Sequence, residues 1–313
     1  MKFWWFVVVL GVTGVAQGEL KYEEPRTYRL KMVLRVEATG TVRNVQAVGP
    51  RPIDWPEQKV KLISEKVTPG ATCKETTLVG QAGMVRLQAA QIAAGQMVEV
   101  ERVYEITKYR IVFEGQPNEW VVPKAMSRDI RDCLLESPGV EMKHPTLIEL
   151  AKPMRAESTL PWDTALQVQK WVKENVKYEN GQFRGALFAV QNKSGDCEEM
   201  SALFTALCRL QGIPARNVWV EGHDYPEFYL TDGKGRGAWI PLQLVGADWF
   251  GKMADYRPIL QKGDKIQNPF TRRFERHVPQ TLTGVGAVPK LIVENRILSE
   301  VDINSPDFSA VMP

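Results

Sequence analysis

The change of hydrophobic period between Met200 and Gln243 is the feature that most constrains the fold. Apolar side chains recur at helical spacing from Met200 to Gln211, and Gly212 and Pro214 then end the helix. Beyond this helix end, period-two alternation in three short segments predicts antiparallel strands. The segments are 217–221, 225–230 and 238–243. A helix followed directly by three short strands predicts an α+β core in this part of the chain.

Period-two alternation also runs through the first half of the chain. Between Arg26 and Glu37, apolar residues at even positions alternate with mostly charged residues, which indicates a half-buried strand. Further strand-like runs are separated by turn residues: 42–48, 59–63, 84–87, 97–106 and 109–113. Several short strands at this spacing predict a β-sandwich. Since no candidate catalytic residues gather there, we expect a structural or substrate-presenting module.

Helical patterns begin after Pro123. Ser127 can cap a first helix that reaches Leu134, and a second helix is expected over 146–155. Pro161 opens a third helix over 164–176, with an apolar stripe that is typical of a core-facing helix. These helices precede the stretch described first, so they are expected to belong to the same α+β core.

The tail that begins at Pro258 has no assigned chemistry. Its basic residues Arg272, Arg273 and Arg276 are expected to form a solvated face, and 290–293 is a strand candidate. We therefore expect a signal peptide, a β-sandwich, an α+β core and a C-terminal extension that could pack on the core. Their boundaries are 1–18, 19–125, 126–257 and 258–313.

The first residues predict export. Lys2 precedes an apolar run from Phe3 to Val15, and small residues around Gly18 offer a cleavage site. The run is shorter than the roughly 20 apolar residues that a spanning helix needs, which favours a cleaved signal peptide over an uncleaved anchor. No later stretch of the sequence is long and apolar enough to span a membrane. We expect a periplasmic or secreted protein without a membrane span after signal cleavage.

The composition indicates which partners and which disulfides are to be expected. The 313 residues are 44% hydrophobic with a net charge of +3, which fits globular domains and lacks the dense basic face that nucleic acid requires. Four cysteines are too few for a scaffold built on disulfides. Cys73 and Cys133 could form a bridge. Cys197 and Cys208 would lie about 16 Å apart along one helix, which is too far for a bond.

Cys197 falls in the first turn of the predicted helix. Asp196 and Glu199 have the spacing of a capping box, which places the cysteine near free backbone N–H groups and the positive end of the helix dipole. Both features favour the thiolate, but the carboxylates of Asp196, Glu198 and Glu199 oppose it. A cationic partner is therefore required.

His223 is the candidate partner. It lies directly after the turn at Gly222 and leads into the second predicted strand, and a helix N-terminus packed on this sheet would bring Cys197 to it. The imidazole could then take the thiol proton and return it to a leaving group. Considered separately, each residue has an ordinary structural explanation. A cysteine is commonly a small buried hydrophobe, which is our expectation for Cys208, and a strand histidine is commonly only hydrogen-bonded.

Several motifs together resemble the transglutaminase-like superfamily. They are Gly195-Asp196-Cys197, the helix end 208–216 and the strand 223–229, and the helix end 171–178 is also similar. The resemblance covers residues 160–245. It implies a papain-like α+β core in which Cys197 is the nucleophile and His223 is its base. A β-sandwich in front of this core suits the broader group.

The sequence departs from the family pattern at Gln243, where the family commonly has an aspartate at the end of a tryptophan-containing strand. An amide oxygen can accept the N–H of a histidine and fix its tautomer, so Gln243 is a usable third site residue. It lacks the negative charge that supports an imidazolium. Asp248 could instead reach the site from a loop, and Tyr178 and Gln191 are candidates for an oxyanion-hole side chain.

The resemblance implies a cysteine-dependent enzyme that attacks peptide or protein amides, with hydrolysis favoured over crosslinking. The alternative is a non-catalytic module that binds a peptide or an envelope partner, which Gln243 favours and the pair of Cys197 and His223 opposes. No cofactor is expected. No metal site is expected either, because the histidines at 144, 223 and 277 show no ligand spacing with the cysteines.

Overall fold

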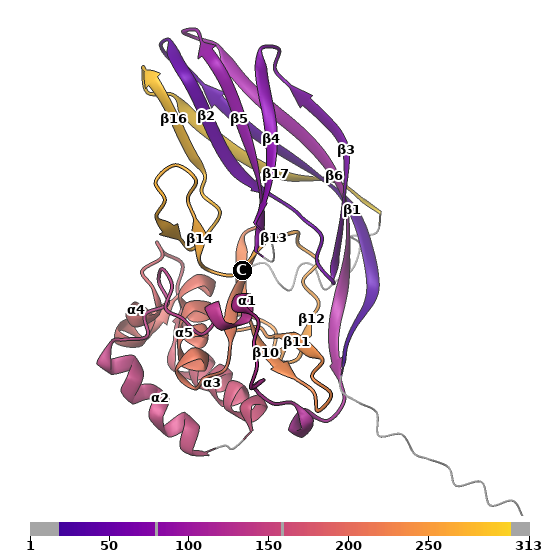
Figure 1. Cartoon of the computed structure of the whole chain (residues 1–313), viewed down its shortest axis with the longest axis vertical. Helices are drawn as coiled ribbons and strands as arrows, with labels where there is room; N and C mark the ends of the chain where they lie inside the picture. Colours follow the sequence, from indigo (N-terminus) through magenta and orange to yellow (C-terminus); the bar gives the residue numbers. More distant parts are fainter. Residues whose placement is uncertain (1–18, 79–80, 158–159, 302–313) are drawn as a thin grey trace, which may run out of the picture.

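A computed structural model describes residues 19–78, 81–157 and 160–301. The predicted signal peptide, 1–18, lies outside the described residues. Figure 1 shows the long β-strands at one end of the molecule and the α-helices at the other. The fold is therefore mixed α+β with a β-rich N-terminal region, as the sequence predicts.

One antiparallel sheet of five strands is centred on β1, which pairs with β6 on one side and β17 on the other. β3 and the short β12 also pair with β6. Apolar even-numbered residues of β1, among them Leu30 and Leu34, are buried, as their alternation predicts. The bounds are Glu19–Glu37 for β1, Gln58–Val67 for β3, Met97–Glu114 for β6, Lys252–Met253 for β12 and Lys290–Val301 for β17.

A second antiparallel sheet has eight strands and extends from the helical part into the β-rich part. Its order is β11-β10-β9-β13-β5-β2-β16, and β4 pairs with β5. β13 is the link between the two parts, because it pairs with β9 on one side and with β5 on the other. The bounds are Val42–Arg51 for β2, Ala71–Leu78 for β4, Ala82–Ile92 for β5, Ala215–Val220 for β9, His223–Thr231 for β10, Gly237–Pro241 for β11, Ile259–Lys262 for β13 and Thr281–Gly286 for β16.

The two sheets bury a shared hydrophobic core in the β-rich part. Leu34 and Val100 from the first sheet pack in one cluster with Val45 and Leu87 from the second, and none of these four side chains is more than 1% exposed. Burying a side chain of this size stabilises a fold by about 1.5–3 kcal/mol. The alternating pattern of the N-terminal half therefore reflects sheet faces that cover one another.

The helical part is built around α5, which Figure 1 shows among α2, α3 and α4 and against the strands of the second sheet. The α5 side chains at helical spacing, including Leu203 and Phe204, are fully buried. Phe204 faces Phe228 of β10 with ring centroids 6.4 Å apart. Cys208 is fully buried in this core, as expected. The helix bounds are Pro117–Glu119 for η1, Arg128–Asp132 for α1, Pro145–Glu157 for α2, Pro161–Asn175 for α3, Ala186–Asn192 for α4 and Cys197–Leu210 for α5.

Four short strands complete the description. β7 and β8 pair in parallel just before α5, and β14 and β15 form a hairpin in the segment that follows β13. The bounds are Lys177–Tyr178 for β7, Ser194–Gly195 for β8, Ile266–Gln267 for β14 and Phe274–Glu275 for β15.

Several local expectations differ from the structure. The first predicted helix ends at Asp132 instead of Leu134, and α4 was not predicted. The strand candidate 290–293 is the start of the longer β17, which returns to pair with β1. Cys73 and Cys133 are free thiols, one on β4 and the other just after α1, so the bridge that the sequence left open does not form.

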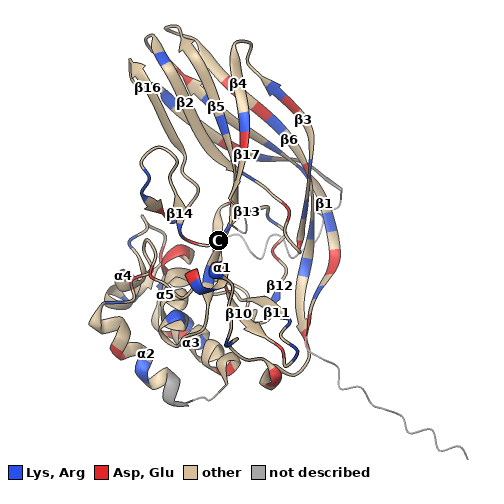
Figure 2. Cartoon of the chain, viewed as in Figure 1, with Lys and Arg blue, Asp and Glu red and all other residues tan. Residues whose placement is uncertain are grey.

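Charge is interspersed over the molecule. Figure 2 shows both basic and acidic residues along each of the strands β1, β3 and β6. Opposite charges pair across these strands, as in the ion pair between Arg35 and Glu99 at 2.8 Å. Within the described residues, no helix has the length and hydropathy needed to span a membrane.

Candidate functional site

Cys197 is the first residue of α5, and the predicted capping box holds this helix start in place. The Asp196 carboxylate accepts hydrogen bonds from the backbone N–H groups of Glu198 at 2.8 Å and Glu199 at 3.4 Å. In return, the Glu199 carboxylate accepts from the backbone N–H of Asp196 at 2.9 Å. The reciprocal bonds satisfy donors that a helix start otherwise leaves free, and they fix the position of Cys197.

Gly195 allows this capping geometry. It lies in β8, which pairs with β7 through Tyr178, and a Cβ at position 195 would lie 2.6 Å from the Glu199 Cβ. The Glu199 side chain, which closes over the glycine, is 1% exposed and also accepts from the Arg184 backbone N–H at 2.7 Å. A side chain at position 195 would therefore displace the carboxylate that caps α5.

Burial and negative charge dominate the surroundings of the Cys197 thiol. Burial, followed by the carboxylates of Asp224 and Asp196, raises the pKa of Cys197 to about 12. A hydrogen bond from the Asp224 backbone and the positive charge of Arg257 act in the opposite direction. The helix start does not offset these effects, so the resting thiol is protonated at neutral pH.

His223 and Gln243 are brought together. The Nε2 atom of His223 lies 3.0 Å from Oε1 of Gln243. Gln243 comes just after β11, the strand that pairs with β10. Gln243 is 1% exposed, and its backbone is fixed by Gln169, whose amide donates to the Gln243 carbonyl at 2.9 Å and to the Trp249 carbonyl at 2.8 Å. The amide oxygen is thus held where it can orient the imidazole.

The electrostatic surroundings keep His223 neutral. Burial lowers the pKa of His223, and the Arg257 charge lowers it further. The carboxylate of Asp255 and the hydrogen bond to Gln243 act in the opposite direction. Asp255 is itself 3% exposed and bonded to Arg257, so its charge is largely compensated. Asp255 and Arg257 were not among the predicted site residues.

Cys197 meets the strand of His223 through the neighbouring residue. One turn along α5 from Cys197, the Ser201 hydroxyl donates to the carbonyl of Asp224, the residue after His223, at 3.4 Å. The start of α5 and the start of β10 are therefore in contact. Among the described residues, no hydrogen bond joins the Cys197 sulfur directly to the His223 ring.

The other sequence candidates are placed differently. Tyr178 lies close enough to Cys197 and Asp196 that their charges, after burial, raise the pKa of its hydroxyl. Gln191 is exposed on α4. Asp248 binds Lys173 at 2.9 Å, and its side chain is 89% exposed, so it does not approach His223. Tyr178 therefore remains a candidate neighbour of the thiol, whereas Asp248 does not.

The segment after β15 also reaches the start of α5, although the sequence suggested no chemistry there. The guanidinium of Arg276 donates to the carboxylate of Glu198, the residue after Cys197. His277 places Nε2 at 3.3 Å from Asp224 Oδ2 and stacks on Trp219 with ring centroids 4.5 Å apart. The expected solvated face is correct for Arg272 and Arg273, which are exposed, and wrong for Arg276.

Three residues at this place have the chemistry of metal ligands. Glu198, Asp224 and His277 each bring one potential ligand atom to within 4.8 Å of the others. Arg276 already binds Glu198, and His277 already contacts Asp224. These contacts describe one ion pair and one hydrogen bond, and we assign no metal to the three residues.

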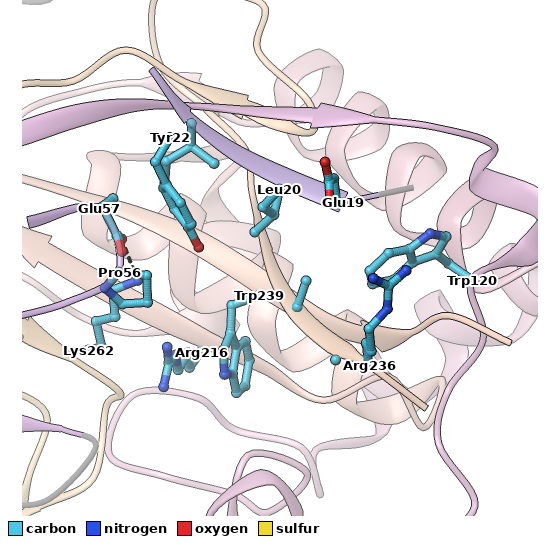
Figure 3. A pocket seen from close by; sticks show the side chains of 13 residues that line it. Glu19, Leu20, Tyr22, Pro56, Glu57, Trp120, Arg216, Arg236, Trp239 and Lys262 are labelled. Carbon is cyan, nitrogen blue, oxygen red and sulfur yellow. Dashed lines mark ion pairs between the residues drawn. The ribbon is translucent and has the colours of Figure 1, made fainter. Parts of the chain in front are cut away.

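A separate pocket of about 270 Å³ lies on the opposite face of the second sheet. Figure 3 shows Tyr22, Trp120 and Trp239 around it, with the helices behind the strands. Its buried charges bind one another: Lys262 contacts Glu57 at 2.6 Å and Glu227 at 3.0 Å. Because the neighbouring strand residues alternate between this face and the α5 face, the pocket does not open onto Cys197.

Comparison with known proteins supports a family assignment. Residues 148–244 match the family described as the Transglutaminase-like superfamily, a range that includes Cys197, His223 and Gln243. No curated protein shows significant similarity to the chain. The fold is similar to a "putative cysteine protease" from Cytophaga hutchinsonii, with a TM-score of 0.62 and 16% identity over 90% of this chain and 93% of that chain. Similarity at this identity indicates a shared fold.

Two further structures are less similar. The periplasmic domain of TgpA from Pseudomonas aeruginosa has a TM-score of 0.35 and 15% identity, over 74% of this chain and 94% of that chain. A "putative protease" from Parabacteroides distasonis has a TM-score of 0.27 and 11% identity, over 74% of this chain and 48% of that chain. These scores are too low to support a conclusion.

A central helix that begins with a cysteine and packs on an antiparallel meander defines the class of the fold as an α+β core. Within that class, residues 148–244 form a domain of the transglutaminase-like superfamily.

Proposed function

We propose that the chain is an exported cysteine-dependent enzyme that attacks the amide carbonyls of peptides or proteins. Cys197 is the nucleophile, His223 is the base, and Gln243 orients the histidine ring on a papain-like core. The observation that carries this proposal is the contact between His223 Nε2 and Gln243 Oε1 at 3.0 Å, at the start of the strand that α5 meets through Ser201 and Asp224. The family match supplies the chemical class.

The protonation states support a base-assisted attack. Burial leaves Cys197 as a thiol and His223 as a neutral imidazole. If Nε2–H of His223 donates to the Gln243 oxygen, Nδ1 is the nitrogen that can accept the thiol proton. Hydrogen bonds between a nucleophile and its base often tighten only when substrate is bound, so their contact in the free chain is not required.

The reaction then proceeds through an acyl-enzyme. The Cys197 sulfur forms a bond to the carbonyl carbon, its proton passes to His223, and the ring returns that proton to the departing amine. Water attacks the thioester next and releases the acid, which makes the chain a hydrolase. Hydrolysis is favoured over transfer to an amine because the similar fold from Cytophaga hutchinsonii is described as a protease, which is a fold-level analogy.

The β-rich part serves as a β-sandwich that presents the substrate or positions the core. Within the described residues, it carries no cluster of a nucleophile, a base or paired carboxylates that would suggest a second reaction centre.

A second candidate function follows from one observation. Gln243 places a neutral amide beside His223, and a core without a full carboxylate triad would also suit a non-catalytic module that binds peptides.

Acylation by p-nitrophenyl acetate tests the proposal without knowledge of the substrate. We expect a stoichiometric burst of p-nitrophenol and an acetyl group on Cys197, detected by mass spectrometry of the Cys197 peptide. The burst should disappear in Cys197→Ala and slow about 100-fold in His223→Ala, because general base catalysis contributes about that much. His144→Ala is the matched control and should acylate like the original chain.

Two results would decide for the non-catalytic module. One is acetylation of Cys197 no faster than that of a free thiol. The other is an equal rate in His223→Ala and the original chain. Cys73→Ser provides a check on the site of labelling, because Cys73 lies on β4 in the β-rich part and should not contribute to the burst.

A further inference from the structure

Three carboxylates belong to residues next to the proposed nucleophile in the chain or on the strand beside it. Asp196 and Glu198 flank Cys197 in the chain, and the charge of Asp224 acts on the thiol from β10. Asp224 is 3% exposed, and its Oδ1 has no hydrogen-bond partner, so little solvent screens its charge. A thiolate at Cys197 therefore forms beside an excess of negative charge, and its formation requires a nearby cation.

Two arginines are close enough to act on Cys197. Arg257 is buried and makes three hydrogen bonds to the carboxylate of Asp255, at 3.0, 3.1 and 2.6 Å. That carboxylate compensates the Arg257 charge. The second cation is Arg276, whose guanidinium binds the carboxylate of Glu198; burial lowers its pKa to about 10, and the charges of Asp196 and Cys197 act in the opposite direction.

The chain holds Arg276 at this place by several independent contacts. Its guanidinium donates to Glu198 and lies 3.7 Å from the ring centroid of Phe183. The buried Gln261 of β13 donates to the Arg276 carbonyl at 2.6 Å and accepts from the Val278 backbone N–H at 2.6 Å. The segment is therefore fixed against the second sheet, and the arginine is directed toward the start of α5.

We propose that Arg276, brought in by the C-terminal extension, compensates the carboxylates near Cys197 and stabilises the negative charge that the sulfur carries once the thiol has lost its proton. The inference rests on the proposed function, since it concerns the same thiol. It makes Arg276 a positioning residue that acts through Cys197 and Glu198 without contacting the substrate. The cationic partner that the helix start alone lacks is thus supplied from 79 residues further along the chain, from 197 to 276.

Other charged and titratable groups lie on the elements packed around the thiol, and they determine the sign of the effect. His223 and Asp224 come from β10, Tyr178 comes from β7, and Glu199 lies on α5 itself. His277 contacts Asp224 from the same segment as Arg276. The charged carboxylates all oppose the thiolate, so removal of Arg276 must make ionisation of Cys197 harder.

The pH profile of Cys197 alkylation by iodoacetamide tests this inference. The rate is followed on the Cys197 peptide by mass spectrometry in the full chain. We expect Arg276→Gln to react about tenfold more slowly at neutral pH, the change that one pKa unit produces, with the profile displaced to higher pH. Arg276→Lys should recover part of the rate, and the exposed Arg273→Gln should match the original chain. Glu198→Gln should change the rate in the opposite direction, because it removes one opposing charge.

The outcomes separate this inference from the proposed function. The rate of alkylation reports ionisation of the Cys197 thiol and does not require His223. The ester burst requires both Cys197 and His223. An unchanged profile in Arg276→Gln, or a lysine variant as slow as the glutamine variant, overturns the role of Arg276 even if the burst is intact. If the original chain shows no burst but the pH profile of Arg276→Gln is displaced, the proposed enzymatic function is overturned and the charge compensation by Arg276 stands. Glu198→Gln keeps the test decisive if Arg276→Gln does not fold.

Discussion

His223 Nε2 and Gln243 Oε1 lie 3.0 Å apart, so an amide oxygen is the group that contacts this ring nitrogen. An amide can hold the ring and its tautomer, and its hydrogen bond opposes the burial that lowers the pKa of His223, but it lacks the negative charge with which a carboxylate supports an imidazolium. The arrangement is consistent with a resting pair that is neutral on both sides.

Substitution of Gln243 separates orientation from charge. Gln243→Ala should slow acetylation of Cys197 about tenfold, because the imidazole loses the partner that fixes it. Gln243→Asp should preserve or increase the rate and move the acid limb of its pH profile upward, since a carboxylate raises the pKa of His223. The measurement is the burst rate with p-nitrophenyl acetate across pH. An alanine variant as fast as the original chain would remove Gln243 from the site.

Stability should fall on both sides of neutral pH. Burial raises the pKa of Cys197 to about 12 and that of Cys133 to about 11, so the unfolded thiols ionise first once the pH exceeds about 8.5. Each then removes about 1.4 kcal/mol per pH unit from the free energy of unfolding until its folded pKa is reached. Burial lowers the pKa of His223, so the unfolded chain takes up this proton first as the pH drops through about 6.5.

Urea unfolding at several pH values checks both limbs. We expect a maximum in the free energy of unfolding between the two limits. His223→Gln should lose less stability on acidification than the original chain, because the buried imidazole is gone. Equal acid limbs in the two proteins would show that His223 is not buried in neutral form.

Gly195→Ala should destabilise the chain by about 1–3 kcal/mol, the usual effect of a forced overlap in a packed site. The new methyl group would displace the Glu199 side chain, which lies 2.6 Å from its position, and open the capping box. Thermal unfolding measures the loss. Gly233→Ala is the matched control, because a Cβ there meets nothing within 4 Å. Equal melting temperatures for the two variants would contradict the packing argument.

Arg209 connects α5 to three other segments and is the strongest test of the helical core. Its guanidinium binds Asp264 at 2.8 Å, the Ala215 carbonyl at 2.8 Å and the Ser137 hydroxyl at 3.0 Å, and its side chain is fully buried. Arg209→Met should lower the free energy of unfolding by about 3–5 kcal/mol, because it leaves the buried Asp264 charge without a partner.

The double variant Arg209→Met with Asp264→Asn is the informative control for this pair. It should lose less than the sum of the two single variants, since neither charge is then left buried alone. The exposed Arg273→Gln should change little. Additive losses would indicate that the two side chains are not coupled.

Local patterns predicted the elements whose signals lie close together in sequence. The spacing of Asp196 and Glu199 predicted the cap of α5, and both hydrogen bonds of the box are present. No comparable signal marks the start of α4, because Gly185 occupies its N-cap position with a φ of 93° and provides no side-chain cap. Helices of this kind depend on tertiary packing, which a single sequence does not display.

The contacts of the C-terminal extension were beyond sequence reasoning for a different reason. Arg276 looked like Arg272 and Arg273, and only the fold distinguishes it by placing Glu198, 78 residues earlier, against its guanidinium. The same holds for β17, whose run Leu291-Ile292-Val293 does not alternate and gives no sign that it pairs with β1. The catalytic assignments of Cys197, His223 and Gln243 remain predictions.

The place of β13 in the second sheet limits how such a core could be exchanged between proteins by recombination. Ile259, Gln261 and Lys262 pair with β9, so a transplanted fragment ending at the predicted boundary of 257 would leave β9 with an unpaired edge. Exposed strand edges of this kind promote association between chains. The same cut would also detach Arg276 from Glu198. A fragment that keeps its structure after recombination would have to include the C-terminal extension, even though the sequence of the extension resembles no catalytic motif.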